Sequence, residues 1–246
     1  MNGNGSVVTV ETPDGQMEVF IALGDSDKPA ACAILYMDVF GLREELFDLA
    51  RAFAAEGCSA AVPDLFHHLP GSRFPPANGR EDRPSADALH ANAVTTIRMS
   101  QADSRALMGW LDTGSAGILP ASYFAIGYCM GGRHALAAAA AMPERIGGGV
   151  SVHGGRLVTE GAASPHHLVS SLTVPFHFAC ARDDPTCPAE HCDILRQEAA
   201  DATARVTLEI LNAHHGWSFP TRWSYDPAAA AHVHKLACAM MMAGTT

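Results

Sequence analysis

The sequence lacks the features that mark several classes of protein. The formal net charge is −10 at pH 7 and no lysine or arginine cluster is present, so neither nucleic acid nor an anionic membrane is an expected partner. No apolar run reaches transmembrane length, and residues 1–5 lack the charged and apolar regions of a signal peptide. No glycine-rich phosphate loop follows a first strand, which leaves no support for a nucleotide, and no cofactor is expected.

The cysteines do not form a recognisable disulfide framework. Their number is odd and they are scattered through apolar segments, at positions 32, 58, 129, 180, 187, 192 and 238. No C-x-x-C pair is present, which removes the usual resolving partner of a thiol redox protein. A reducing compartment fits this usage best, so we expect a cytoplasmic protein.

Length and patterning predict one α/β domain over residues 1–246. With 48% hydrophobic and 17% charged residues, the chain can bury a large core. Apolar runs at 7–11, 17–22, 31–37, 59–62, 123–126, 148–152, 176–181 and 206–211 predict strands. Helical spacing or composition covers 44–56, most of 86–111, 133–141, 189–200 and 227–242. This alternation predicts a mostly parallel sheet with helices on both faces, a hairpin at one edge, and a long loop at 67–85 over the site.

The central stretch is the glycine-rich turn Gly127-Tyr128-Cys129-Met130-Gly131 between a predicted strand and an alanine-rich helix. Glycines on both sides permit a strained backbone at the cysteine. The pattern is that of a nucleophile elbow with cysteine in place of serine. The first helical amides would lower the thiol pKa and stabilise an oxyanion. Taken alone, the stretch fits a packing cysteine equally well.

A thiol nucleophile needs a base, and the base needs an orienting group. The strand expected to end at residue 181 opens into a loop that contains Asp183 and Asp184. The strand expected to end at residue 211 opens into a loop that contains His214 and His215. Acid and histidine thus follow the cysteine in the order found in α/β-hydrolases.

These motifs together resemble the dienelactone hydrolase family. The matching stretches are the elbow at 127–132, an aspartate followed four residues later by Pro188, a histidine followed by Gly216, and the segments 38–41 and 62–66. The resemblance runs from about residue 17 to the last helix, and it implies the α/β-hydrolase fold. It also implies Cys129 as nucleophile, His215 as base and Asp184 as acid, with Asp183 and His214 as the competing neighbours. The oxyanion-hole amides map to Val39 and Met130.

Three further residues are candidates for an auxiliary or substrate-binding role. The family carries an acid at the end of its first central strand, where this chain has Asp38. That carboxylate could hold the resting thiol or contact an arginine, or it could only cap a turn. The family's arginines that bind a substrate carboxylate have two candidates here, Arg83 and Arg222, and either could instead form a surface ion pair.

Metal binding has little support in the sequence. Cys187 and His191 have a helical metal-ligand spacing, but no further ligands accompany them, so no metal is predicted. His67, His68, His166 and His167 are interpreted as polar loop residues. Cys32, Cys58, Cys180 and Cys238 are interpreted as core thiols.

The sequence therefore predicts a cofactor-independent hydrolase of a lactone or small carboxylic ester, with a small-molecule substrate and a monomeric or homodimeric state. Catalysis would proceed by a Cys-His-Asp triad through a thioester acyl-enzyme. The alternative from another class is a non-catalytic binding protein with the same fold, which would need no complete triad.

Overall fold

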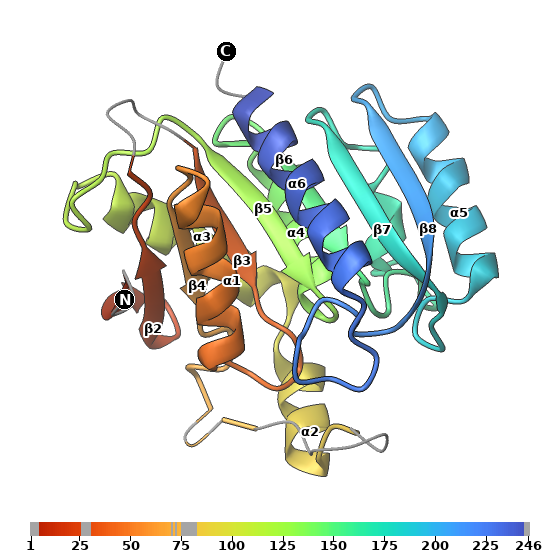
Figure 1. Ribbon diagram of the computed structural model, residues 1–246, viewed down its shortest axis with the longest axis horizontal. Helices are drawn as coiled ribbons and strands as arrows, with labels where there is room; N and C mark the ends of the chain where they lie inside the picture. The colour runs from red at the N-terminus through yellow and green to blue at the C-terminus, as the bar shows by residue number, and fades with distance from the viewer. Residues whose placement is uncertain (1–4, 26–30, 70, 72, 75–82, 244–246) are drawn as a thin grey trace.

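The computed structural model describes residues 5–25, 31–69, 71, 73, 74 and 83–243. Within these residues the strands form one eight-stranded sheet in the order β1-β2-β4-β3-β5-β6-β7-β8 (Figure 1). The strands are β1 Ser6–Thr12, β2 Gly15–Ala22, β3 Cys32–Tyr36, β4 Ala60–Pro63, β5 Tyr123–Tyr128, β6 Ile146–Val152, β7 Phe176–Asp183 and β8 Val206–His214. The helices are α1 Glu44–Ala55, α2 Ala86–Val94, α3 Ile97–Leu111, α4 Gly131–Ala141, α5 Ala189–Ala200 and α6 Pro227–Ala243, with a short 3-10 helix at Pro165–Leu168.

The first two strands form the predicted hairpin at the edge of the sheet. β1 pairs with β2 in an antiparallel register that ends at the pair Thr12 and Gly15. Gly15 has a φ of 124°, a backbone conformation that favours glycine, so the turn fits its sequence. β2 continues antiparallel to β4, and every later pairing in the sheet is parallel.

Parallel pairing brings the carboxyl ends of β3, β5, β6, β7 and β8 to one edge of the sheet. In Figure 1 the arrowheads of β5 and β7 point toward this edge, on the side where α2 lies. Residues that directly follow these strands are therefore neighbours in space although they are far apart in sequence. This edge carries the site described below.

The core explains why the central strands read as continuous apolar runs. All five residues of β3 and all six of β5 are buried, because helices cover both faces of the sheet. Figure 1 shows α1 and α6 in front of the sheet and α4 behind it. α1 buries Leu46, Ala50 and Phe53, which lie on one helical face, and each large side chain buried this way contributes about 1.5–3 kcal/mol. The predicted sheet with helices on both faces is confirmed.

Several predicted segments differ in detail. β7 and β8 extend past the predicted strand ends at 181 and 211, so Asp183 and His214 end these strands and do not lie in the loops that follow. The segment 86–111 divides into α2 and α3 at Thr95 and Thr96, because the Thr96 hydroxyl accepts a hydrogen bond from the Met99 amide and caps α3. The predicted loop at 67–85 lies partly outside the described residues, at 70, 72 and 75–82. Its remaining residues form no helix or strand.

Candidate active site

The elbow between β5 and α4 holds Cys129 in a strained backbone conformation. Its φ is 53°, a left-handed value that is uncommon for a residue with a side chain. Glycines make this turn possible. A Cβ at Gly127 would lie 2.0 Å from the Gly131 carbonyl oxygen, and one at Gly131 would lie 2.2 Å from the Tyr36 carbonyl oxygen. The strain predicted from the sequence is therefore present, and the thiol is held at the carboxyl edge of the sheet.

His215 bridges the elbow thiol and a buried carboxylate. Its Nε2 lies 3.1 Å from Cys129 Sγ, and its Nδ1 lies 2.6 Å from Asp184 Oδ2. The other oxygen of Asp184 accepts hydrogen bonds from the backbone amide and the hydroxyl of Thr186, at 2.8 and 2.7 Å. Asp184 is only 4% exposed, so its carboxylate depends on these donors. Sequence reasoning did not identify Thr186, although an aspartate in a loop commonly accepts hydrogen bonds from the residue two positions later.

Asp183 and His214, the neighbours that competed for these roles, lie close to each other. His214 Nδ1 lies 3.5 Å from Asp183 Oδ2, and both side chains are about half exposed or more. The His214 ring packs against Trp223, with 4.9 Å between ring centroids. Because successive strand residues face opposite sides, only one histidine of the pair can reach the elbow.

The charges of this group stabilise one another. Burial disfavours a charged imidazole, but the interactions with Cys129 and with the Asp184 carboxylate outweigh it and raise the pKa of His215 to about 10. Burial also opposes the charge on Asp184, yet the His215 and Thr186 hydrogen bonds lower its pKa below the usual value. A charged His215 beside the Asp184 carboxylate is therefore favoured.

The two amides assigned to an oxyanion hole lie on the loops that follow β3 and β5. Among the described residues, neither the Val39 amide nor the Met130 amide donates a hydrogen bond to a protein acceptor. The Val39 loop is held by Asp38, whose Oδ1 accepts from the Phe40 amide at 3.2 Å. Both amides are thus available at the same edge as the thiol.

Asp38 contacts arginines, which was one of the three roles considered for it. The carboxylate is fully buried and accepts from Arg43 at 2.5 and 3.0 Å and from Arg222 at 3.3 Å. No contact among the described residues joins it to Cys129. Arg222 is thereby linked to Asp38, and its guanidinium lies 4.4 Å from the Phe40 ring centroid. Arg83 is exposed ahead of α2, and no described contact joins it to the triad residues. Sequence reasoning missed Arg43, five residues after Asp38.

A second pair of arginines, also missed from the sequence, borders a pocket beside the elbow. The pocket has a volume of about 260 Å³, and its lining includes Arg133, Arg156, Asn92, Thr96 and Thr159. Arg133 Nη2 donates to the side-chain and backbone oxygens of Asn92 at 2.6 and 3.2 Å. Burial and the charge of Arg156 lower the pKa of Arg133 to about 10, while Cys129 opposes this, so Arg133 remains positive at neutral pH. The position of Arg133 in the first turn after the elbow was the signal that could have identified it.

His153 lies beneath His215 at the end of β6 and was not singled out from the sequence. Its ring centroid is 5.1 Å from that of His215, and its Nε2 is 2.7 Å from the Ser218 hydroxyl. The residue is fully buried, and burial together with the His215 and Arg222 charges holds its pKa well below the usual value. A neutral His153 packs against the His215 ring without competing for its proton.

The metal pairing considered for Cys187 and His191 is replaced by a different grouping. The Cys187 sulfur lies with those of Cys180 and Cys192, and no group of three possible ligands found among the described residues includes His191. All three of these thiols are buried. Cys180 is thus a buried thiol as predicted, but one of a cluster.

Comparison with known proteins decides the family. The model of the dienelactone hydrolase family matches residues 17–243, nearly the whole chain. The chain belongs to this family. Membership makes it a hydrolase of the lactone and carboxylic-ester type with a small-molecule substrate, and the predicted α/β-hydrolase fold is confirmed.

Individual relatives are distant. An Escherichia coli (strain K12) protein named "Putative carboxymethylenebutenolidase" is 26% identical over 211 residues, which is 83% of this chain and 74% of that protein. The structure is similar to that of a "Putative Dienelactone Hydrolase" from Klebsiella pneumoniae, with a TM-score of 0.84, 20% identity, and 96% and 97% of the two chains covered. A dienelactone hydrolase from Anabaena variabilis gives a TM-score of 0.68 at 15% identity, with 99% of each chain covered. At such identities the two structural matches bear on the fold alone.

Among the described residues, no helix is both long enough and apolar enough to cross a membrane.

Proposed function

We propose that this dienelactone hydrolase family member cleaves a lactone or small ester that carries an anionic group, with Cys129 as nucleophile, His215 as proton carrier and Asp184 as orienting acid. The observation that carries the proposal is the position of His215, with one ring nitrogen 3.1 Å from the Cys129 sulfur and the other 2.6 Å from the Asp184 carboxylate. Nucleophile, base and orienting acid in hydrogen-bond series are the requirement for covalent acyl transfer.

The reaction begins from the ion pair of thiolate and imidazolium. The thiolate attacks the carbonyl carbon, and the carbonyl oxygen takes the negative charge, which the Val39 and Met130 amides stabilise. The carbon–oxygen bond to the leaving group then breaks, and His215 gives its proton to the leaving oxygen. A thioester on Cys129 remains. In a lactone the leaving oxygen stays attached to the acyl group.

Deacylation uses the same histidine as a base. Once the thioester forms, the negative charge of Cys129 is gone, so one of the causes that raised the pKa of His215 is lost and the pKa falls. A neutral imidazole then takes a proton from water, and the resulting hydroxide attacks the thioester. The carbon–sulfur bond breaks, the acid product leaves, and the thiolate and imidazolium are restored.

The anionic part of the substrate is assigned to the pocket beside the elbow. Arg133 and Arg156 line it, and both guanidinium groups are suited to a carboxylate. Arg222 is less suited to this task because Asp38 already engages it. The proposal therefore moves the anion-binding role from Arg83 and Arg222 to Arg133 and Arg156.

A matched pair of substrates tests the proposal. Two esters with the same leaving group, one with a carboxylate on the acyl part and one with a methyl ester there, are compared on wild type and on Arg133→Gln. We expect the substitution to raise KM for the carboxylate substrate by about tenfold or more and to leave the neutral one within about twofold. Arg145→Gln is the control, because Arg145 pairs with Asp112 at the surface.

The outcomes separate the two parts of the proposal. Equal effects on both substrates would remove the anion pocket but leave the triad. Absence of hydrolysis with every lactone and ester in a panel would instead favour the non-catalytic binding protein. Family membership and the juxtaposed thiol, imidazole and carboxylate count against that alternative.

A further inference from the structure

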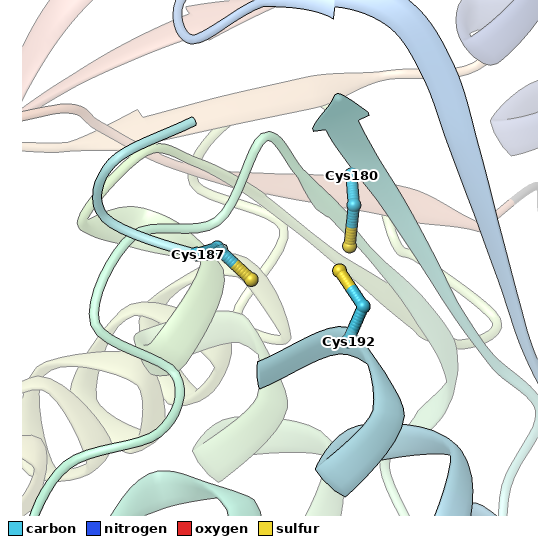
Figure 2. Close-up of side chains that lie close together, drawn as sticks. All are labelled: Cys180, Cys187 and Cys192. Carbon is cyan, nitrogen blue, oxygen red and sulfur yellow. The ribbon is translucent and has the colours of Figure 1, made fainter. Parts of the chain in front are cut away.

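Three buried cysteines converge behind the loop that carries Asp184. Cys180 comes from β7, Cys187 from the loop after β7, and Cys192 from the first turns of α5. Figure 2 shows the three sulfur atoms pointing toward one another from these separate elements. The residues are 2%, 2% and 1% exposed. Nothing in the hydrolytic reaction uses them.

The spacing of the sulfurs is close to what one metal ion requires. The three Sγ atoms lie within 4.8 Å of one another. A metal–sulfur bond of about 2.3 Å in a trigonal arrangement places sulfurs about 4.0 Å apart. The cluster would therefore need to contract by less than about 1 Å, which thiol rotamers and the loop can provide.

We propose that Cys180, Cys187 and Cys192 form a three-sulfur binding site for a soft monovalent metal ion, cuprous copper. Thiolates are soft ligands that suit Cu(I), zinc and iron–sulfur clusters, so the number of sulfur ligands distinguishes these metals. Structural zinc sites take four protein ligands, whereas the groups found among the described residues give this cluster three sulfurs and no fourth donor. Each sulfur that binds as a thiolate releases its proton to solvent, so one metal–sulfur bond replaces one sulfur–hydrogen bond.

The surroundings of the cluster are compatible with an anionic complex and with entry of the ion. α5 begins at Ala189, so Cys192 lies near the positive end of its dipole. Thr186 and Pro188, on either side of Cys187, are partly exposed, so the sulfurs lie one residue layer below the surface.

Binding would tie the acid-bearing loop to its neighbours. The Cys187 amide donates to the Asp184 carbonyl oxygen at 3.3 Å, so the cysteine and the acid belong to one turn. An ion bound to all three sulfurs would fasten this turn to β7 and α5. The expected consequence is added stability of the folded state, which follows from binding to the native chain alone.

The test uses Cys129→Ala protein, because the elbow thiol would also bind thiophilic metals. Reduced protein is titrated anaerobically with Cu(I) held by a chromogenic chelator. We expect one Cu(I) per chain, an X-ray absorption spectrum with three sulfur ligands at about 2.3 Å, and a higher thermal unfolding midpoint. Adding Cys187→Ala or Cys192→Ala should weaken Cu(I) binding by about tenfold or more.

Cys32→Ala is the matched control, since Cys32 is a fully buried thiol outside the cluster. This substitution should leave the affinity for Cu(I) within about twofold. Absence of competition with the chelator, two sulfur ligands instead of three, or equal affinities in the cluster and control variants would overturn the proposal. Tighter binding of Zn(II) than of Cu(I) would overturn the choice of ion. If a cluster variant fails to fold, the sulfur count in the folded Cys129→Ala protein still decides.

Discussion

Replacing Asp184 by asparagine removes one charge from the bridge between acid, imidazole and thiol. The carboxylate accepts from His215 Nδ1 at 2.6 Å and from Thr186 at 2.7 and 2.8 Å. Asparagine can keep the Thr186 bonds through its carbonyl oxygen, but then its amide group faces the Nδ1–H as a second donor. The imidazolium loses its anion and the ring loses its orientation. We expect kcat/KM to fall about 10³-fold, or about 4 kcal/mol of transition-state stabilisation.

The neighbouring aspartate provides the control in the same loop. Asp183 lies 3.5 Å from His214, and 62% of its side chain is exposed. Asp183→Asn should therefore change kcat/KM by less than about threefold, since exposed pairs contribute little. Initial rates of ester hydrolysis measure both variants, with circular dichroism to verify folding. A loss below about tenfold for Asp184→Asn, or the larger loss for Asp183→Asn, would refute the assignment of the acid.

Three further predictions concern charge and backbone. Asp38→Asn should lower the free energy of unfolding, measured in urea, by about 3–5 kcal/mol, because it leaves two arginines beside a neutral group. The control Glu18→Gln removes a surface ion pair and should cost under about 1 kcal/mol. A loss below about 1 kcal/mol for both variants would mean that Asp38 is a simple turn residue. His215→Gln should slow iodoacetamide alkylation of the elbow thiol about tenfold near neutral pH. The alkylation rates of the variant and the wild type should converge as the pH rises through about 10, where the wild-type histidine loses its charge. Equal alkylation rates at all pH values would contradict the proposed ion pair. Gly127→Ala should abolish folding or activity, because the new Cβ would lie 2.0 Å from a carbonyl oxygen. The control Gly109→Ala, whose Cβ would have nothing within 4 Å, should be neutral or stabilise the fold by up to about 1 kcal/mol. A stable, active Gly127→Ala protein would show that the turn can relax.

Much of the fold was predictable because local patterns and parallel topology agree. Continuous apolar runs identified β3 and β5, which are buried on both faces. The position of each motif directly after a strand was sufficient to place Cys129, Asp184 and His215 at one edge of the sheet. The twin residues could be separated on family spacing only, and the contacts of Asp183 and His214 supply the physical reason.

The residues that were not predicted depend on contacts that form only in the folded chain. Arg133 contacts Asn92, 41 residues away in sequence, and sequence spacing does not encode such long-range pairing. Arg43 lies only five residues after Asp38, but the turn that brings the two side chains together was not predicted. The cluster of Cys180, Cys187 and Cys192 depends on how β7 and α5 pack, so its members looked like separate core thiols. Arg222 was one of two candidates for substrate binding, and its contact with the buried Asp38 became visible only in three dimensions.

The central claim is a covalent thioester on Cys129. Wild-type protein is mixed with a small activated ester and quenched during turnover, and the intact mass and peptide map are determined by mass spectrometry. We predict a mass increase equal to the acyl group, located on the peptide that contains Cys129, and neither acylation nor hydrolysis in Cys129→Ala. Hydrolysis by Cys129→Ala within about tenfold of wild type, or an acyl group on another residue, would contradict this mechanism.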